Sequence, residues 1–229
     1  MRKLFGKADL LTLTIVFLLS PFAVQAADKK PPEQIGDGLV LKKDSKVDFA
    51  YVKPDVDWQK YKTIYIRQLS VTDEAKDATP KKKPSRKGHL GESWIIPEKD
   101  ISLMQEEFTR IMKEALAKEG YQVVEQPQAD TLVIVPVIID IFLKAPIEES
   151  RKTHKSRGGT FTDGAGSMTV AASFADGEDL RVLAYAVDNK YPSSMWSRNT
   201  RIQNISDMRA VFKSWGKMLA KTLKKIQEK

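Results

Sequence analysis

The chain of 229 residues contains no cysteine and only 2 histidines. Without cysteine it has no disulfide, no thiolate nucleophile, no Cys-ligated zinc and no iron–sulfur cluster, and no thiol that could carry a lipid. His89 and His154 each stand alone, because neither has a second His, a Cys or a Glu at metal-binding spacing. We therefore expect no metal, no cofactor and no lipid anchor.

Known catalytic motifs are also missing. Residues 164–167 come closest to Gly-x-Ser-x-Gly, but they lack the second glycine and lead into a predicted strand rather than a helix. Residues 157–160 contain glycines beside Arg157, as a phosphate-binding loop does, but no helix follows them. We therefore predict that the protein is not an enzyme.

Two groups of carboxylates have a simpler explanation than catalysis. Asp is a common turn former because its side chain bonds to nearby backbone N–H groups. The groups stand before the first predicted strand and in a predicted hairpin turn: Asp55 and Asp57, then Asp176, Glu178 and Asp179. A divalent cation in the hairpin turn would lack the spaced ligands of a calcium loop. An unrecognised hydrolase is kept as an alternative, which requires Asp or Glu residues converging in one cleft.

Residues 1–26 have the three-part order of a secretory signal peptide. A basic start is followed by the apolar run 10–19 and by Val24-Gln25-Ala26, with small residues where signal peptidase reads them. The apolar run is shorter than the roughly 17–25 residues that a spanning helix needs. We expect cleavage after Ala26 and export to the periplasm.

The remaining chain divides into an N-terminal arm over 27–50 and one domain over 51–229. Runs of β-branched, aromatic or apolar residues predict strands at 63–71, 121–124, 131–143 and 180–188, and clean alternation predicts a strand at 167–175. Patterns of three and four predict amphipathic helices at 97–118 and 206–226, with Ser206 as an N-cap. The order β-α-β-β-β-β-α predicts an α+β fold, in which a mostly antiparallel sheet carries two amphipathic helices packed on one face. Pro136 predicts an edge position or a bulge.

Two basic loops, at about 72–97 and 144–166, are candidates for partner binding. Their cations could contact anionic lipid head groups, an anionic polymer or an acidic surface of another envelope protein, although solvated loops are the simpler alternative. Nucleic acid is not expected, because no aromatic residues alternate with the cations. If 121–124 and 131–143 formed a hairpin, the loops would lie at opposite ends of the fold. The candidate residues are Lys81, Lys82, Lys83, Arg86, Lys87, Arg151, Lys152, Lys155 and Arg157.

A second candidate segment contains Trp196, Arg198 and Arg201. A Trp beside Arg is typical of a binding hot spot, and here it would serve a small molecule or a glycan. A buried Trp that pins a long connection to its domain is the alternative.

Two stretches, joined by Leu116 to Gly120-Tyr121, together resemble a family of exported bacterial proteins, domain of unknown function 3313. They are Tyr51-Val52-Lys53-Pro54-Asp55-Val56-Asp57-Trp58 leading to Ile64-Tyr65-Ile66, and Asp176-Gly177, Val187-Asp188 and Asp207-Met208-Arg209-Ala210-Val211-Phe212 with Trp215. The resemblance covers about 50–226 and implies residence in the cell envelope. It implies no activity, so no catalytic residue is carried over. Many members look like lipoproteins, and this chain departs from them in having no cysteine.

These observations together predict a non-catalytic binding or interaction module in the periplasm. A periplasmic domain that binds a small molecule or a glycan is the first alternative.

Overall fold

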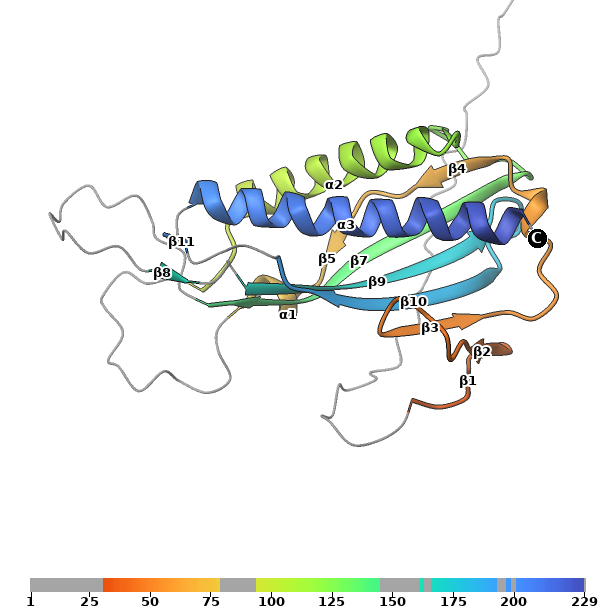
Figure 1. Ribbon diagram of the computed structural model, residues 1–229, viewed down its shortest axis with the longest axis horizontal. Helices are drawn as coiled ribbons and strands as arrows, with labels where there is room; N and C mark the ends of the chain where they lie inside the picture. Colours follow the sequence, from red (N-terminus) through yellow and green to blue (C-terminus); the bar gives the residue numbers. More distant parts are fainter. Residues whose placement is uncertain are drawn as a thin grey trace, which may run out of the picture. The chain divides into compact units, whose positions relative to one another are not determined.

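The computed structural model describes residues 31–78, 94–144, 161–162, 166–192, 197–198 and 201–228, with backbone only at 161–162 and 197–198. The part from Pro31 onward forms one unit. It combines a sheet of nine strands with three α-helices, which confirms the predicted α+β class (Figure 1). None of the helices in the described ranges has both the length and the apolarity needed to cross a bilayer.

The strands of the sheet are joined in the order β1-β2-β3-β10-β9-β7-β4-β6, and β5 pairs with β7. A separate two-stranded sheet pairs β8 with β11. The strand bounds are β1 (Gln34–Ile35), β2 (Leu39–Leu41), β3 (Phe49–Val52), β4 (Thr63–Ile66), β5 (Ser70–Val71), β6 (Gln122–Val123), β7 (Thr131–Leu143), β8 (Phe161–Thr162), β9 (Gly166–Asp176), β10 (Val182–Lys190) and β11 (Ser197–Arg198). The helices are η1 (Trp58–Lys60, 3-10), α1 (Asp73–Lys76), α2 (Glu98–Lys118) and α3 (Arg201–Gln227).

The sheet is mixed, so the prediction of a mostly antiparallel sheet is wrong. One half is antiparallel, since β7 pairs with β9, β9 with β10, and β10 with β3. In the other half β4 runs parallel to both β7 and β6, and β5 runs parallel to β7. The physical reason is α2, a crossover helix that returns the chain to the starting end of the sheet before β6 begins.

Residues 121–124 and 131–143 do not pair with each other as a hairpin. Thr63 lies opposite Gln122 on one side and opposite Thr131 on the other, so β4 separates β6 from β7. The short connection between β6 and β7 therefore passes across one strand instead of forming a tight turn.

The described part of the predicted N-terminal arm belongs to the sheet. Strand β1 pairs with β2, and β2 pairs with β3. The Tyr51 hydroxyl donates a hydrogen bond to the Pro32 carbonyl oxygen at 3.1 Å. Residues 34–41 thus extend the edge formed by β3.

Pro136 lies in the interior of the sheet, against the prediction of an edge position or a bulge. It faces Ala172 of β9. On the other side of β7, the residues that pair with β4 end at Ile134, and those that pair with β5 begin at Val137. Pro136 therefore has no ladder partner on that side. The irregularity of β7 lies further on, between Ile138 and Asp140. An interior proline is tolerated here because the neighbouring strand is itself interrupted.

The two long helices run parallel and side by side (Figure 1). Helix α2 matches its predicted bounds, and Gly120 follows it with the positive φ of a helix terminator. Helix α3 begins at Arg201, so Ser206 lies inside the helix and its prediction as N-cap is wrong. The contact from Arg201 back to α2 holds the extra turn in place. The predicted packing of both helices on one face of the sheet stays a prediction.

Contacts recur along the whole length of this helix pair. They are Arg201–Asp100, Arg209–Glu107, Phe212–Phe108, Gly216–Ala115 and Lys224–Glu119. The helices approach each other closely at Gly216, where an added Cβ would lie 2.9 Å from the Ala115 Cβ. Glycine inside a helix costs about 1 kcal/mol relative to alanine, so its role here is to let the two backbones approach. The buried faces of both helices join strand residues in one core cluster.

Two buried carboxylates anchor the layers through hydrogen bonds. The Trp215 indole N–H of α3 donates to Asp188 of β10 at 2.8 Å. At the far end of β9, Asp176 accepts from Lys60 Nζ, the Tyr61 hydroxyl and the Glu178 backbone N–H, each at 2.8 Å. Burial alone raises the pKa of Asp176, but these hydrogen bonds and the charge of Lys60 outweigh it and lower the pKa from 3.8 to about 2.

Because of this lowered pKa, the free energy of unfolding decreases at acid pH. Asp176 contributes stability that is complete above about pH 4 and is lost as the pH falls toward about 2. We expect Asp176→Asn to lower the free energy of unfolding at neutral pH by about 2 kcal/mol and to flatten its pH dependence in that window. Urea unfolding followed by circular dichroism measures both effects. Asp44→Asn, at an exposed carboxylate, is the control, and an equal loss in both variants would contradict this role of Asp176.

Candidate functional site

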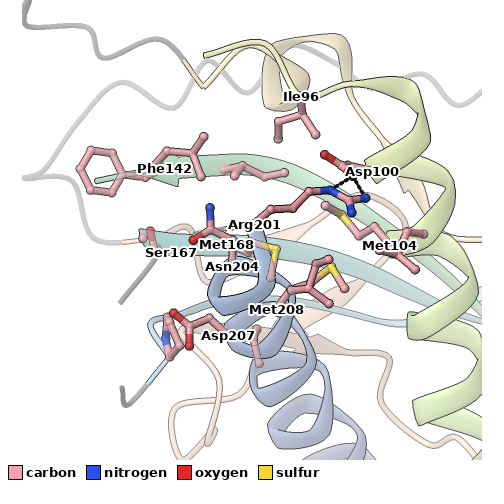
Figure 2. Close-up of a pocket in the computed structure, with 17 residues that line it drawn as sticks. Ile96, Asp100, Met104, Phe142, Ser167, Met168, Arg201, Asn204, Asp207 and Met208 are labelled. Carbon is pink, nitrogen blue, oxygen red and sulfur yellow. Dashed lines mark hydrogen bonds and ion pairs between the residues drawn. The ribbon is translucent and has the colours of Figure 1, made fainter. Parts of the chain in front are cut away.

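An apolar pocket lies where α2 and α3 begin, beside the end of β7 and the start of β9. Figure 2 shows lining residues that converge from these four elements, together with Ile96, which precedes α2. The empty space inside it, including its open mouth, is about 910 Å³. Its position follows from the fold, because the parallel helices both start at this end and the strands that cover the core finish here.

Most of the pocket wall is apolar. Of the 17 lining residues, 11 have apolar side chains: Ile96, Leu103, Met104, Ile141, Phe142, Leu143, Met168, Pro192, Ile205, Met208 and Val211. Further along the helices, the edge-to-face rings of Phe108 and Phe212 fill the space between α2 and α3. Three methionines stand in the pocket wall instead, and their unbranched side chains adapt to the shape of a bound molecule.

Exposed apolar side chains gather at the same end. Phe142 lines the pocket and is 43% exposed. Ile95, Tyr191 and Ile202 are the chain neighbours of the lining residues Ile96, Pro192 and Arg201, and they are 53%, 65% and 82% exposed. Large apolar side chains that stay in solvent beside an apolar cavity are typical of a binding surface.

The polar groups of the pocket differ in whether they have a partner. Arg201 donates to Asp100 Oδ1 through Nη2 at 2.6 Å and through Nε at 3.1 Å, the pair drawn with dashed lines in Figure 2. The carboxylate of Asp207 is buried and accepts from Gln203 at 2.8 Å. The Asn204 side-chain oxygen is buried as well, but within the described part of the chain it has no hydrogen-bond partner.

An unpaired buried oxygen is costly for the fold. A buried acceptor without a partner costs about 1–3 kcal/mol, because it loses its hydrogen bonds to water on folding and forms none within the protein. Asn204 carries this cost at a position in the pocket wall, although the oxygen itself is closed to solvent.

The structure brings one of the predicted site residues to this pocket. Arg201 lines it, as part of α3 rather than of the irregular segment that we predicted. Only the backbone of Arg198 is described, in β11 opposite Phe161, and Trp196 lies outside the described residues. The basic candidates also lie outside them: Lys81, Lys82, Lys83, Arg86, Lys87, Arg151, Lys152, Lys155 and Arg157. Both histidines, His89 and His154, do so too.

The described ends of the first predicted basic loop are ordered. Residues 73–76 form α1, and Asp77 makes a β-bridge to Ile95, so the undescribed stretch is 79–93. The prediction of a loop over about 72–97 is therefore wrong at 73–76, where the chain is helical. Thr72 caps α1 by accepting from the Ala75 N–H, a local signal that the basic composition of the segment concealed.

The acidic candidates act in turns, as predicted. Asp57 accepts from the Gln59 N–H at the start of η1, and Asp179 accepts from the Arg181 N–H. Asp176 holds the cluster with Lys60 and Tyr61 described above. Among the residues that the structure describes, no three His, Asp or Glu side chains form a group that could hold a metal ion.

A family model described as a protein of unknown function, DUF3313, matches residues 38–219. The chain belongs to this family. The match spans most of the chain and both long helices, so the pocket lies within the DUF3313 region. No curated protein matches the chain.

Several solved structures are similar to this DUF3313 chain at low identity. The protein XCC0632 from Xanthomonas campestris is 11% identical, with a TM-score of 0.42 over 72% of this chain and 86% of that one. A PelC dodecamer from Paraburkholderia phytofirmans is 14% identical, with a TM-score of 0.34 over 70% and 86%. A minor lipoprotein from Acinetobacter baumannii is 14% identical, with a TM-score of 0.30 over 71% and 92%. Similarity at this level supports no conclusion about what the present chain binds.

The unpaired oxygen gives a prediction about stability without ligand. Asn204→Leu keeps the size of the side chain and removes the unpaired acceptor, so we expect the free energy of unfolding to rise by about 1 kcal/mol. Asn189→Leu is the matched control, because Asn189 donates to Thr169 Oγ1 at 2.7 Å and its loss should cost about 1 kcal/mol. Urea unfolding measures both values. A loss of stability in Asn204→Leu as large as in the control would show that the Asn204 oxygen is satisfied.

Proposed function

We propose that this protein is a non-catalytic binding module of the bacterial cell envelope and that the apolar pocket is its binding site. The observation that carries the proposal is the pocket wall, in which 11 residues are apolar and only a few side chains are polar. Ligand pockets have this composition, mostly apolar with a few placed polar groups that fix orientation.

The proposal includes export to the periplasm without a lipid anchor. Residues 1–26 support export through their basic start, apolar run and small residues before Ala27. The absence of cysteine from the sequence supports the absence of a lipid anchor, because a lipoprotein carries its lipid on a cysteine.

Binding fits the pocket better than catalysis does. Asp100 and Asp207 both line it, which is the convergence that a hydrolase requires, but each carboxylate is already held by a side chain of α3, Arg201 or Gln203. A carboxylate engaged in this way orients its neighbours and is poorly placed to exchange protons with a substrate. Of the small-molecule alternatives, the apolar wall favours an apolar ligand over a glycan.

A substitution that fills the pocket tests this function. Ile205 lies in the pocket wall on α3, and Ile205→Trp places an indole in the cavity. We expect the affinity for the neutral apolar dye Nile red, measured by fluorescence titration, to fall by about tenfold or more, since the dye loses its apolar contacts. Lys213→Trp adds the same indole at an exposed position of α3 outside the pocket and should leave the affinity unchanged. Equal dye binding by both variants would rule out this pocket as the site.

The two basic loops are a second candidate site, for an anionic membrane, an anionic polymer or an acidic envelope protein. One observation favours it: the described stems of both loops lie at the same end of the fold. The Ala78 N–H donates to the Trp94 carbonyl oxygen at 3.1 Å, and Leu143 faces Gly166. The residues Ile96, Leu143 and Gly166 all line the pocket. The hairpin that would have put the loops at opposite ends does not form, because β4 lies between β6 and β7.

Removing residues 79–87 tests the basic loops. Each cation near an anionic membrane contributes about 1 kcal/mol, so the deletion should weaken low-salt binding to anionic phospholipid vesicles by about tenfold or more. Vesicles of neutral phosphatidylcholine are the control. A full-length variant in which the five cations of this segment are replaced by glutamine separates the loss of charge from the loss of chain length. If the deletion variant bound anionic vesicles as well as the wild type does, the loop would have no role in membrane binding.

A further inference from the structure

We infer that the exposed face of α3 is a docking surface for an anionic membrane, which it contacts through a row of lysines. The row consists of Lys213, Lys217, Lys221 and Lys225, which recur at every fourth residue and are all exposed. At 1.5 Å per residue the row is about 18 Å long. None of its members lines the pocket. The inference therefore goes beyond the proposed function and shares with it only the location in the cell envelope.

The charge of α3 has one sign over most of its length. From Met208 to Gln227 the helix holds six cations and no acidic residue. Helix α2, which lies beside it, holds four cations and five acidic residues. There Arg110 forms ion pairs with both Glu107 and Glu114 along the helix. The one-sided charge is therefore a property of α3 and not of the helix pair.

The lysine row has no counter-charge in the described part of the chain. Two other cations of the same stretch reach α2: Arg209 pairs with Glu107 at 2.8 Å, and Lys224 pairs with Glu119 at 3.2 Å. Within the described ranges, no lysine of the row forms an ion pair. Glu107 and Glu119, which face α3 from α2, are thus already engaged by other residues, and the charges of the row remain available to a partner.

The row does not serve the stability of the helix. Like charges at positions i and i+4 are neighbours on a helix surface and repel each other. Cations in the last turn gain from the negative end of the helix dipole, but Lys213 and Lys217 lie two or more turns before Gln227 and gain little. Solubility does not require one sign either, because interspersed charges of both signs provide it. The arrangement therefore points to an anionic partner.

The side chains around the row favour a membrane over a protein. The exposed positions beside the lysines hold small residues, Ala210, Ser214 and Thr222, and beyond Ile202 the helix exposes no large apolar side chain that could act as a hot spot. The arginines of the helix pair form fixed ion pairs, since their planar fork suits one defined carboxylate. Lysines are flexible, hydrated point charges, which suit the mobile head groups of anionic phospholipids.

Sedimentation with vesicles tests the inference on the chain from Ala27 onward. The variant replaces Lys213, Lys217 and Lys221 with glutamine. Each cation close to an anionic membrane contributes about fivefold in affinity. At low salt the variant should therefore bind vesicles that contain phosphatidylglycerol about a hundredfold more weakly than the wild type does. Arginine at the same three positions keeps the charges and should keep the affinity within about twofold.

A second triple variant separates this surface from net charge. Lys42, Lys46 and Lys62 are exposed outside α3, and in the described ranges none of them forms an ion pair. Their replacement by glutamine removes the same net charge and should weaken binding by less than about threefold. The basic residues at 79–87 are present in both variants, so their contribution cancels in the comparison. Salt of about 1 M, where the Debye length is about 3 Å, should abolish binding by the wild type.

Three results would overturn the inference. The first is equal binding by the two triple variants. The second is binding to soluble dextran sulfate without binding to anionic vesicles, which would indicate an anionic polymer instead. The third is a lower urea midpoint for the α3 variant, because the lysines would then serve the fold, whereas relief of their repulsion should leave the midpoint equal or higher. Dye binding in the pocket is unaffected by these outcomes, so the proposed function stands or fails separately.

Discussion

The close approach of α2 and α3 at Gly216 and Ala115 is the constraint on which the rest of the structure depends. Two parallel helices this close share one direction and one starting end, so their N-termini lie together. Bulky rings occupy the middle of the helix pair, where Phe108, Phe212 and Trp215 lie in the core. At the starting end methionines replace rings, and Arg201 and Asp100 link the helices through an ion pair rather than through packing. The pocket is the space that this change leaves.

The two ends of the sheet satisfy their polar groups in opposite ways. At the Asp176 end, a buried carboxylate has three donors, and its pKa falls to about 2 as a result. At the pocket end, the buried side-chain oxygen of Asn204 has no hydrogen-bond partner among the described residues, which lowers the stability of the fold there.

Local patterns predicted the elements whose periodicity is long and regular. Residues 131–143 and 97–118 were predicted almost to the residue, because a long apolar strand and a stripe of apolar residues at three- and four-residue steps leave little choice. Pairing was not predictable in this way, since the position of β4 between β6 and β7 depends on the crossover through α2. The start of α3 was missed because it is fixed by a contact with Asp100, which is far away in the sequence. Asn204 has no sequence signal at all, as its unpaired oxygen exists only once the helices are packed.

The position of Asp100 connects the fold to the proposed ligand chemistry. Parallel helices present two positive ends at one place, which by itself makes an anion site. Here Asp100 in the first turn of α2 meets the Arg201 guanidinium, and Asp207 lies one turn further along α3 from Asn204. The chain therefore supplies its own anions where a ligand anion would otherwise bind. An uncharged apolar molecule suits such a pocket, because it contacts the apolar wall and adds no charge to it.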